Sequence, residues 1–158
     1  MIIITVALFE VLFMFYMKEY YYSMAKSYLE QQVRYTQNSY DSSGMDSTSF
    51  QDKINNILEK EGLNQSSGYG ESSDNFSVAI EIINKNKEVM LDQYGIKTGE
   101  VVNYDDVNKA LTGSQDYNFY IYSISETKDH IMSISVPLKV NNVVEGVVRY
   151  SVSLKKAD

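Results

Sequence analysis

The amino-terminal 38 residues, which contain neither glycine nor proline, constrain this chain more than any other feature. Because these two residues most often end or break a helix, one helix can run from about Ile2 to Thr36. The helix is apolar as far as Met17 apart from Thr5 and Glu10, and charged and tyrosine residues follow. The sequence therefore predicts a long first helix that begins apolar and continues as an amphipathic segment.

The apolar run at residues 2–17 predicts a membrane anchor. Tyrosines at 20–22 are typical of a membrane–water interface, where the ring is buried and the hydroxyl stays hydrated. As a helix the run is about 24 Å long, somewhat short of a hydrocarbon core of about 30 Å. Glu10 is costly in hydrocarbon unless it is protonated or paired. A buried core helix and a cleaved signal peptide remain as alternatives, although the run lacks the flanking signals of a signal peptide.

Composition excludes several classes of function. The net charge is −7 and no basic patch is present, so we expect no nucleic-acid partner. The chain has no cysteine, which excludes disulfides and cysteine-based metal or redox sites. A single histidine, His130, removes most histidine-dependent metal and nucleophile schemes. We therefore expect no catalytic residues, no metal site and no cofactor in this segment, which is not an enzyme by itself.

Beyond residue 18 the first helix carries two apolar flanks. The first has helical spacing and consists of Tyr22, Ala25, Leu29 and Val33. The second consists of Tyr21, Met24, Tyr28 and Tyr35. One flank can pack on a sheet and the other on a partner helix, so we expect a homodimer through the amino-terminal helix. The alternative is that both flanks belong to one wide buried face.

The rest of the chain predicts a sheet with two further helices. A polar loop at 37–47 precedes a short amphipathic helix at about Ser49 to Glu61. Alternating patterns then predict strands at 76–83, 88–92, 117–125, 130–140 and 143–154. A short helix near Asp105, closed by Gly113, separates the second strand from the third. This order predicts an α+β fold, a PAS-like five-stranded antiparallel sheet with the long helix across one face.

The last two strands predict a sheet with one apolar and one mixed face. The apolar set consists of Met132, Ile134, Val136, Leu138, Val144, Gly146, Val148, Tyr150 and Val152. We expect this face to lie under the long helix. The mixed face would then lie beneath the short helix and the loops.

Candidate ligand-binding residues lie on the mixed face. They are Arg149, Ser133, Ser135 and Ser151, with Tyr120 and Tyr122 as neighbours. An arginine among serines and tyrosines suits a carboxylate or a similar small anion. The alternative is a structural ion pair from Arg149 to Glu81 or Glu145.

Four short motifs in the second half resemble a known family. They are Asp92-Gln93-Tyr94-Gly95, Asp105 to Gly113, Ser133 to Leu138, and Gly146 to Leu154. In this order they resemble the extracytoplasmic sensor region of bacterial sensor histidine kinases of the WalK/PhoR type. The resemblance implies a single Cache (PAS-like) sensor domain between two membrane helices, and a small ligand or an extracellular protein partner.

This resemblance gives the expected organisation of the chain. Residues 1–17 form a transmembrane anchor, 18–36 an extracellular continuation of the same helix, and 37–158 the PAS-like/Cache sensor domain. We expect a location in the cell membrane with the residues after about 18 extracytoplasmic. No second span and no kinase follow, so we expect a fragment of a longer receptor.

Two other functions fit the same pattern. The first is the sensor domain of a chemotaxis receptor or another signalling protein, which has the same fold. The second is a type IV pilin-like structural subunit, because Glu10 lies in an apolar helix that continues onto a sheet. No processing site precedes the apolar run, which disfavours the pilin alternative.

Overall fold

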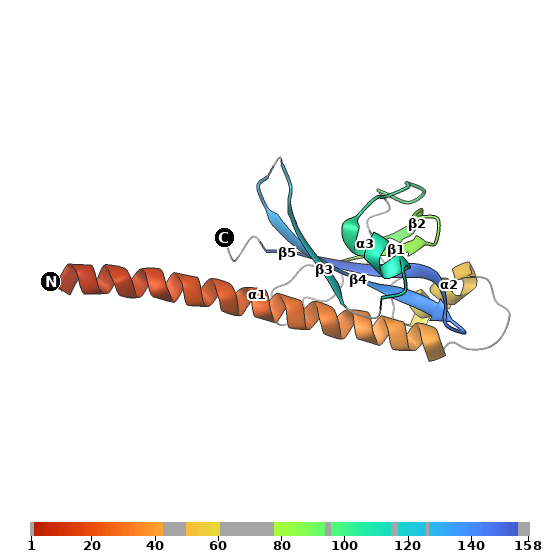
Figure 1. Cartoon of the computed structure of the whole chain (residues 1–158), viewed down its shortest axis with the longest axis horizontal. Helices are drawn as coiled ribbons and strands as arrows, with labels where there is room; N and C mark the ends of the chain where they lie inside the picture. Colours follow the sequence, from red (N-terminus) through yellow and green to blue (C-terminus); the bar gives the residue numbers. More distant parts are fainter. Residues whose placement is uncertain are drawn as a thin grey trace.

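The structure is a computed structural model that describes residues 2–42, 50–60, 78–93, 96–114, 117–125 and 127–154. Its elements are α1 (Ile2–Ser42), α2 (Phe50–Lys60), β1 (Val78–Asn84), β2 (Val89–Asp92), α3 (Asp105–Leu111), β3 (Asn118–Ser123), β4 (His130–Val140) and β5 (Val143–Ser153). The predicted fold class, α+β with a long amino-terminal helix packed on a five-stranded antiparallel sheet, is confirmed (Figure 1). The predicted loop at 43–47 and the first two residues of the predicted first strand lie outside the described residues.

The sheet has the order β2-β1-β5-β4-β3, and every neighbouring pair is antiparallel. The turn between β4 and β5 is made by Asn141 and Asn142, whose φ angles are 50° and 64°. Two positive φ angles in succession are typical of the tight turns that connect hairpin strands. Helix α1 lies along one face of the sheet, whereas α3 lies on the other (Figure 1). The sheet therefore separates α1 from α3, and α3 lies on the predicted mixed face, which is called the polar face below.

Helix α1 is longer than predicted, because residues 37–42 are helical and not a loop. Contacts with the sheet explain the difference. The hydroxyl groups of Thr36 and Tyr150 are 2.6 Å apart in a buried hydrogen bond, and Gln37 Nε2 donates to the Pro137 carbonyl at 3.0 Å. Tyr40, only 1% exposed, lies in the core. Tertiary packing thus extends the helix through a polar segment that lacks a helical pattern of its own.

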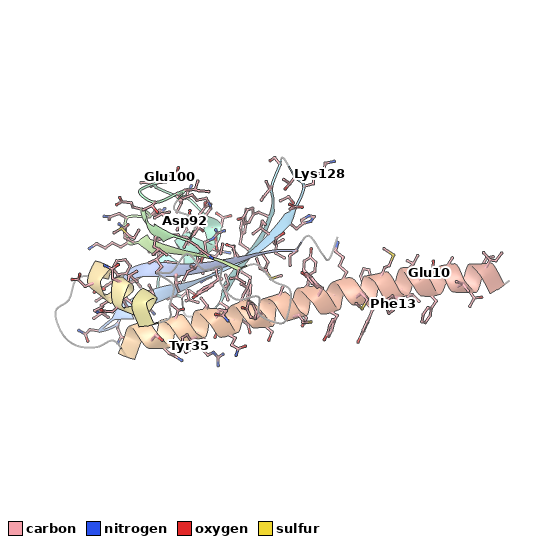
Figure 2. All side chains as sticks on the ribbon, turned by 180° about the vertical axis from the view of Figure 1, so that it is seen from behind. Glu10, Phe13, Tyr35, Asp92, Glu100 and Lys128 are labelled. Atoms are coloured by element: carbon pink, nitrogen blue, oxygen red, sulfur yellow. The ribbon has the colours of Figure 1, made fainter. Side chains whose placement is uncertain are left out.

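The two halves of α1 have opposite surroundings. The amino-terminal half extends beyond the sheet, with Glu10 and Phe13 far from the other elements (Figures 1 and 2). Its large apolar side chains between Ile3 and Met17 are each 47–84% exposed. None of the described helices is both long enough and apolar enough to cross a membrane.

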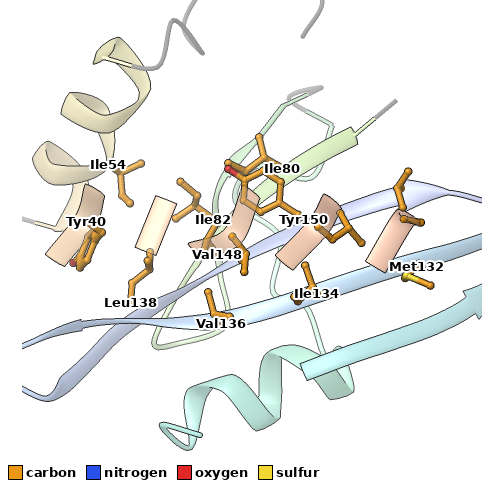
Figure 3. Close-up of a cluster of buried hydrophobic side chains, with 14 of the residues drawn as sticks. Tyr40, Ile54, Ile80, Ile82, Met132, Ile134, Val136, Leu138, Val148 and Tyr150 are labelled. Atoms are coloured by element: carbon orange, nitrogen blue, oxygen red, sulfur yellow. The ribbon is translucent and has the colours of Figure 1, made fainter. Parts of the chain in front are cut away.

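The carboxyl-terminal half of α1 packs on the apolar face of the sheet. Ala25, Leu29 and Val33 of the first predicted flank are fully buried there. They contact the predicted strand residues, among them Met132, Ile134, Val136, Leu138, Val148 and Tyr150 (Figure 3). The predicted assignment of this face to the long helix is confirmed.

The second predicted flank does not form a separate surface. Tyr21 and Met24 pack at the margin of the same core, whereas Tyr35 is 62% exposed. The arrangement therefore agrees in part with the alternative of one wide buried face. A homodimer through this helix stays a prediction.

Candidate functional site

The polar face of the sheet is covered by α3 and by the segment that leads into it. The helix begins at Asp105, and Gly113, with a φ of 85°, follows its end. Asp106 shares the inner side of α3 with Val107 and Ala110, and it is only 1% exposed. The predicted helix thus places the Asp106 carboxylate against the polar face of the sheet.

Arg149 on β5 is the centre of a buried ionic cluster. Its Nε donates to Asp106 Oδ2 at 2.8 Å, its Nη1 to Glu81 Oε2 at 2.7 Å and its Nη2 to Ser133 Oγ at 3.0 Å. Arg149 is 1% exposed and Glu81 is 4% exposed. Glu81 is the residue opposite Arg149 in the β1–β5 register, which accounts for their contact.

Asp106 accepts hydrogen bonds from two serines as well as from Arg149. Ser133 Oγ lies at 3.1 Å and Ser135 Oγ at 2.7 Å from its Oδ2. Burial alone would lower the pKa of Arg149, but the charges of Asp106 and Glu81 raise it above its usual value. Arg149 therefore stays charged at every physiological pH.

Lys97 completes the cluster from the segment between β2 and α3. Its Nζ donates to Glu81 Oε1 at 3.1 Å and to Tyr104 Oη at 3.0 Å, and its side chain is 38% exposed. Burial would lower its pKa, but the Tyr104 hydrogen bond and the Glu81 charge raise it above the usual lysine value. The ring of Tyr104 lies 4.2 Å from the Arg149 guanidinium carbon, so this segment stacks on the cluster.

A cavity of about 290 Å³ adjoins this cluster. Its lining residues are Ala79, Glu81, Asp92, Ile96, Lys97, Tyr122, Ile124, Ile131, Arg149, Ser151, Val152 and Ser153. Asp92 and Glu100 mark its side of the sheet, opposite α1 (Figure 2). Ile96 is 78% exposed although it lines the cavity, so the cavity opens to solvent beside it. The cavity lining is thus largely apolar but includes side chains of both charges.

Five of the six predicted site residues fall into two groups. Arg149, Ser151 and Tyr122 line the cavity. Ser133 and Ser135 instead lie beneath α3, where they bind Asp106.

Tyr120 lies beside Tyr122, and of the two carboxylates proposed as partners of Arg149, only Glu81 pairs with it among the described residues. Tyr120 is 37% exposed and stacks on Tyr122, with ring centroids 5.8 Å apart. The ion pair that the sequence left open involves Glu81, whereas Glu145 accepts a hydrogen bond from Tyr40. The ionic alternative for Arg149 is therefore present in the structure, beside the cavity.

Sequence reasoning missed Asp106 and Lys97. Asp106 had no predicted site role, yet it lies four residues before the buried Ala110 and so shares the buried face of α3. That spacing is a signal that could have identified it. Lys97 lies in an irregular segment, where no periodicity indicates the direction of a side chain.

Comparison with known proteins gives structural neighbours only. No protein-family model matches the chain, and no curated protein sequence is significantly similar to it. The ligand-binding domain of the Campylobacter jejuni chemoreceptor Tlp3, in complex with 4-methylisoleucine, is 12% identical with a TM-score of 0.61. That of the Pseudomonas aeruginosa PAO1 amino acid chemoreceptor PctC, in complex with GABA, is 14% identical with a TM-score of 0.55.

These two similarities assign the fold, which is that of chemoreceptor ligand-binding domains. They cover 91% and 89% of this chain but 57% and 60% of the neighbours. This chain therefore spans less than two thirds of either neighbour.

Proposed function

We propose that this chain is the small-ligand-sensing part of a membrane-bound signalling receptor of the chemotaxis type. The observation that carries the proposal is the cavity beside the Arg149 cluster, on the face of the sheet opposite α1. Two chemoreceptor ligand-binding domains with the same fold support it. Sensing by such a domain requires no catalysis, because a ligand that binds one conformation better shifts an equilibrium between two conformations.

The proposed ligand is a small zwitterion with an apolar body. The apolar lining residues Ile96, Ile124 and Ile131 suit the body of such a ligand, and the charged lining residues offer both signs. The carboxylates of Asp106 and Glu81 already pair with the Arg149 guanidinium, which disfavours the simple anion suggested by the sequence. The ligands of the two neighbours, 4-methylisoleucine and GABA, each carry an ammonium group and a carboxylate.

The proposal includes a location in the cell membrane, with the residues after about 18 extracytoplasmic. The exposed apolar side chains between Ile3 and Met17 support it, because a continuous apolar surface is unfavourable in water. Carbonate washing of membranes from expressing cells tests the location. The proposal requires the chain to stay in the membrane fraction, and release into the wash would contradict it.

A sensor histidine kinase is the second candidate for the parent protein. The four motifs between Asp92 and Leu154 favour it, whereas the two structural neighbours favour a chemoreceptor. Sequencing the gene downstream of these codons separates the two. A long helical cytoplasmic signalling region is expected, and a phosphoacceptor histidine with an ATP-binding domain would establish the kinase instead.

A thermal-shift screen of amino acids and small amines on the purified chain tests the sensing role. We expect at least one compound to raise the melting temperature of the wild type, because a ligand that binds only the folded state stabilises it. The matched control is Ser151→Phe, which fills the cavity from β5 and should abolish the shift. A screen without any hit, or a shift that Ser151→Phe leaves unchanged, would contradict the proposal.

A further inference from the structure

Without Lys97, the positive and negative charges of the buried cluster would not balance. Arg149, Asp106 and Glu81 lie on β5, α3 and β1 and are each at most 4% exposed. Together they carry one positive and two negative charges. Because an unpaired carboxylate is costly to bury, these three residues require a second cation beside Glu81. Lys97 supplies it.

Lys97 is the most exposed of the four charged residues. Its side chain is 38% exposed, whereas those of Arg149 and Glu81 are 1% and 6% exposed. It comes from an irregular segment, whereas the other three lie on a helix or on strands of the sheet. A lysine ammonium is a compact charge on a flexible stem, and its two acceptors would stay in place without it. Lys97 is therefore the replaceable member of the cluster.

One of the two acceptors of Lys97, Glu81, lines the cavity, and the other, Tyr104, lies next to it on the far side of the Lys97 ammonium. Glu81 Oε1 and Tyr104 Oη lie 3.1 Å and 3.0 Å from its Nζ, and Glu81 and Lys97 both line the cavity. The ammonium group of a small amine has the same charge and the same three donors as that of lysine. An amine bound there could lay its apolar body along Ile96, Ile124 and Ile131.

We propose that Lys97 is a tethered substitute for the ammonium group of the ligand, and that a ligand must displace it from Glu81 and Tyr104 to bind. This inference rests on the proposed sensing function and adds the specificity-determining residue and an autoinhibitory contact. A tethered competitor has a high effective concentration, so it weakens the apparent affinity for amines. Displacement releases the Lys97 side chain from Glu81 and Tyr104, while the Lys97 backbone N–H keeps its 3.1 Å hydrogen bond to Asp92 Oδ2. Ligand binding is thereby linked to the side-chain contacts of the segment before α3.

The test is chemical complementation of Lys97→Ala with n-butylammonium, which reproduces the whole lysine side chain and is one carbon longer than the part that the substitution removes. The probe is titrated into the full chain in detergent micelles, and NMR chemical shifts give the Kd. Lys97→Ala is expected to bind n-butylammonium at least about tenfold more tightly than the wild type, because the competitor is gone. Butyrate, which has the opposite charge, should have the same affinity for the wild type and for Lys97→Ala.

Two further variants make the result specific. Lys109→Ala removes an exposed lysine of α3 and should leave n-butylammonium binding at the wild-type level. Adding Glu81→Gln to Lys97→Ala removes the carboxylate acceptor and should abolish the gain. If Lys97→Ala does not fold, Lys97→Met keeps the stem as far as the position of the lysine Cε, and the ammonium ion replaces the longer probe with the same expected gain.

Equal binding of n-butylammonium by the wild type and folded Lys97→Ala would overturn the inference, as would binding by neither protein. Retained binding after Glu81→Gln would also overturn it. The ligand screen on the wild type tests sensing independently. Hits in that screen together with a failed complementation would leave the sensing role intact and make Lys97 a plain ion-pair partner. Complementation without any hit would leave an ammonium subsite that has no sensing role.

Discussion

Arg149 belongs both to the buried ionic cluster and to the lining of the cavity. It is 1% exposed, it binds two carboxylates and a serine, and it also lines the cavity. Buried ion pairs add little net stability compared with an apolar core, but removal of one partner leaves an uncompensated charge. At this residue a change made to test ligand binding therefore also tests folding.

Arg149→Met should destabilise the chain by about 3–5 kcal/mol, because Asp106 would remain buried without a cation. Urea unfolding followed by circular dichroism measures the loss. Arg34→Met is the matched control, since Arg34 is exposed and hydrogen-bonds only the Tyr117 hydroxyl among the described contacts. It should cost less than about 1 kcal/mol. A loss of that small size for Arg149→Met would refute the structural role of the cluster.

Gly146→Ala should cost about 1–3 kcal/mol, because the added carbon has no space. A Cβ at this position would lie 2.5 Å from the Ile83 carbonyl oxygen and 2.5 Å from the Phe50 ring. Thermal unfolding measures the loss. Combining it with Phe50→Ala relieves one of the two contacts, so the pair should be less destabilised than the sum of the single changes. Full additivity would indicate that α2 does not pack there.

At the scale of elements, the two halves of α1 have different surroundings. Its carboxyl-terminal half is held by the sheet, and its amino-terminal half has its apolar side chains exposed (Figure 1). The same residue type should therefore have different energetic effects in the two halves. Leucines at 12 and 29 allow a direct comparison, because one is 67% exposed and the other is fully buried.

Leu29→Ala should lower the free energy of unfolding by about 2–5 kcal/mol, as is typical of a fully buried leucine. Leu12→Ala is the control and should change it by less than about 0.5 kcal/mol. Denaturant unfolding of both variants in the same detergent measures the difference. Similar losses for the two variants would mean that residue 12 also packs within the folded domain, contrary to the structure.

The elements could largely be predicted from the sequence, because their patterns are local. Alternation in β4 and β5 identified the face beneath α1, and the Asn141-Asn142 pair identified the tight turn. The end of α1 could not be predicted, since contacts with Tyr150 and Pro137 stabilise residues that are locally polar.

The site residues were predicted only in part, because some of their contacts join segments that are far apart in sequence or lack a periodic pattern. The position of Arg149 follows from strand alternation, and its ion pair with Glu81 was among the predicted alternatives, but Asp106 comes from a helix 43 residues away in sequence. Lys97 lies in a segment without periodicity, so only the three-dimensional arrangement reveals its ion pair with Glu81.

At the scale of the whole molecule, β5 connects the cavity with the long helix. Arg149 and Tyr150 are neighbours on this strand and point to opposite faces. The first belongs to the ionic cluster, and the hydroxyl of the second lies 2.6 Å from that of Thr36 on α1. A change at the cavity therefore has a short physical route to the helix, although coupling along it has to be measured.

Calorimetric titration tests most directly whether this cavity binds a small ligand. The wild type and Ser151→Phe are titrated with L-isoleucine, with GABA and with each compound that raises the melting temperature in the screen. We predict saturable one-to-one binding to the wild type for at least one compound, and a loss of affinity of at least about tenfold, about 1.4 kcal/mol, in Ser151→Phe. Absence of binding to the wild type, or equal affinities for both proteins, would contradict the proposed ligand binding.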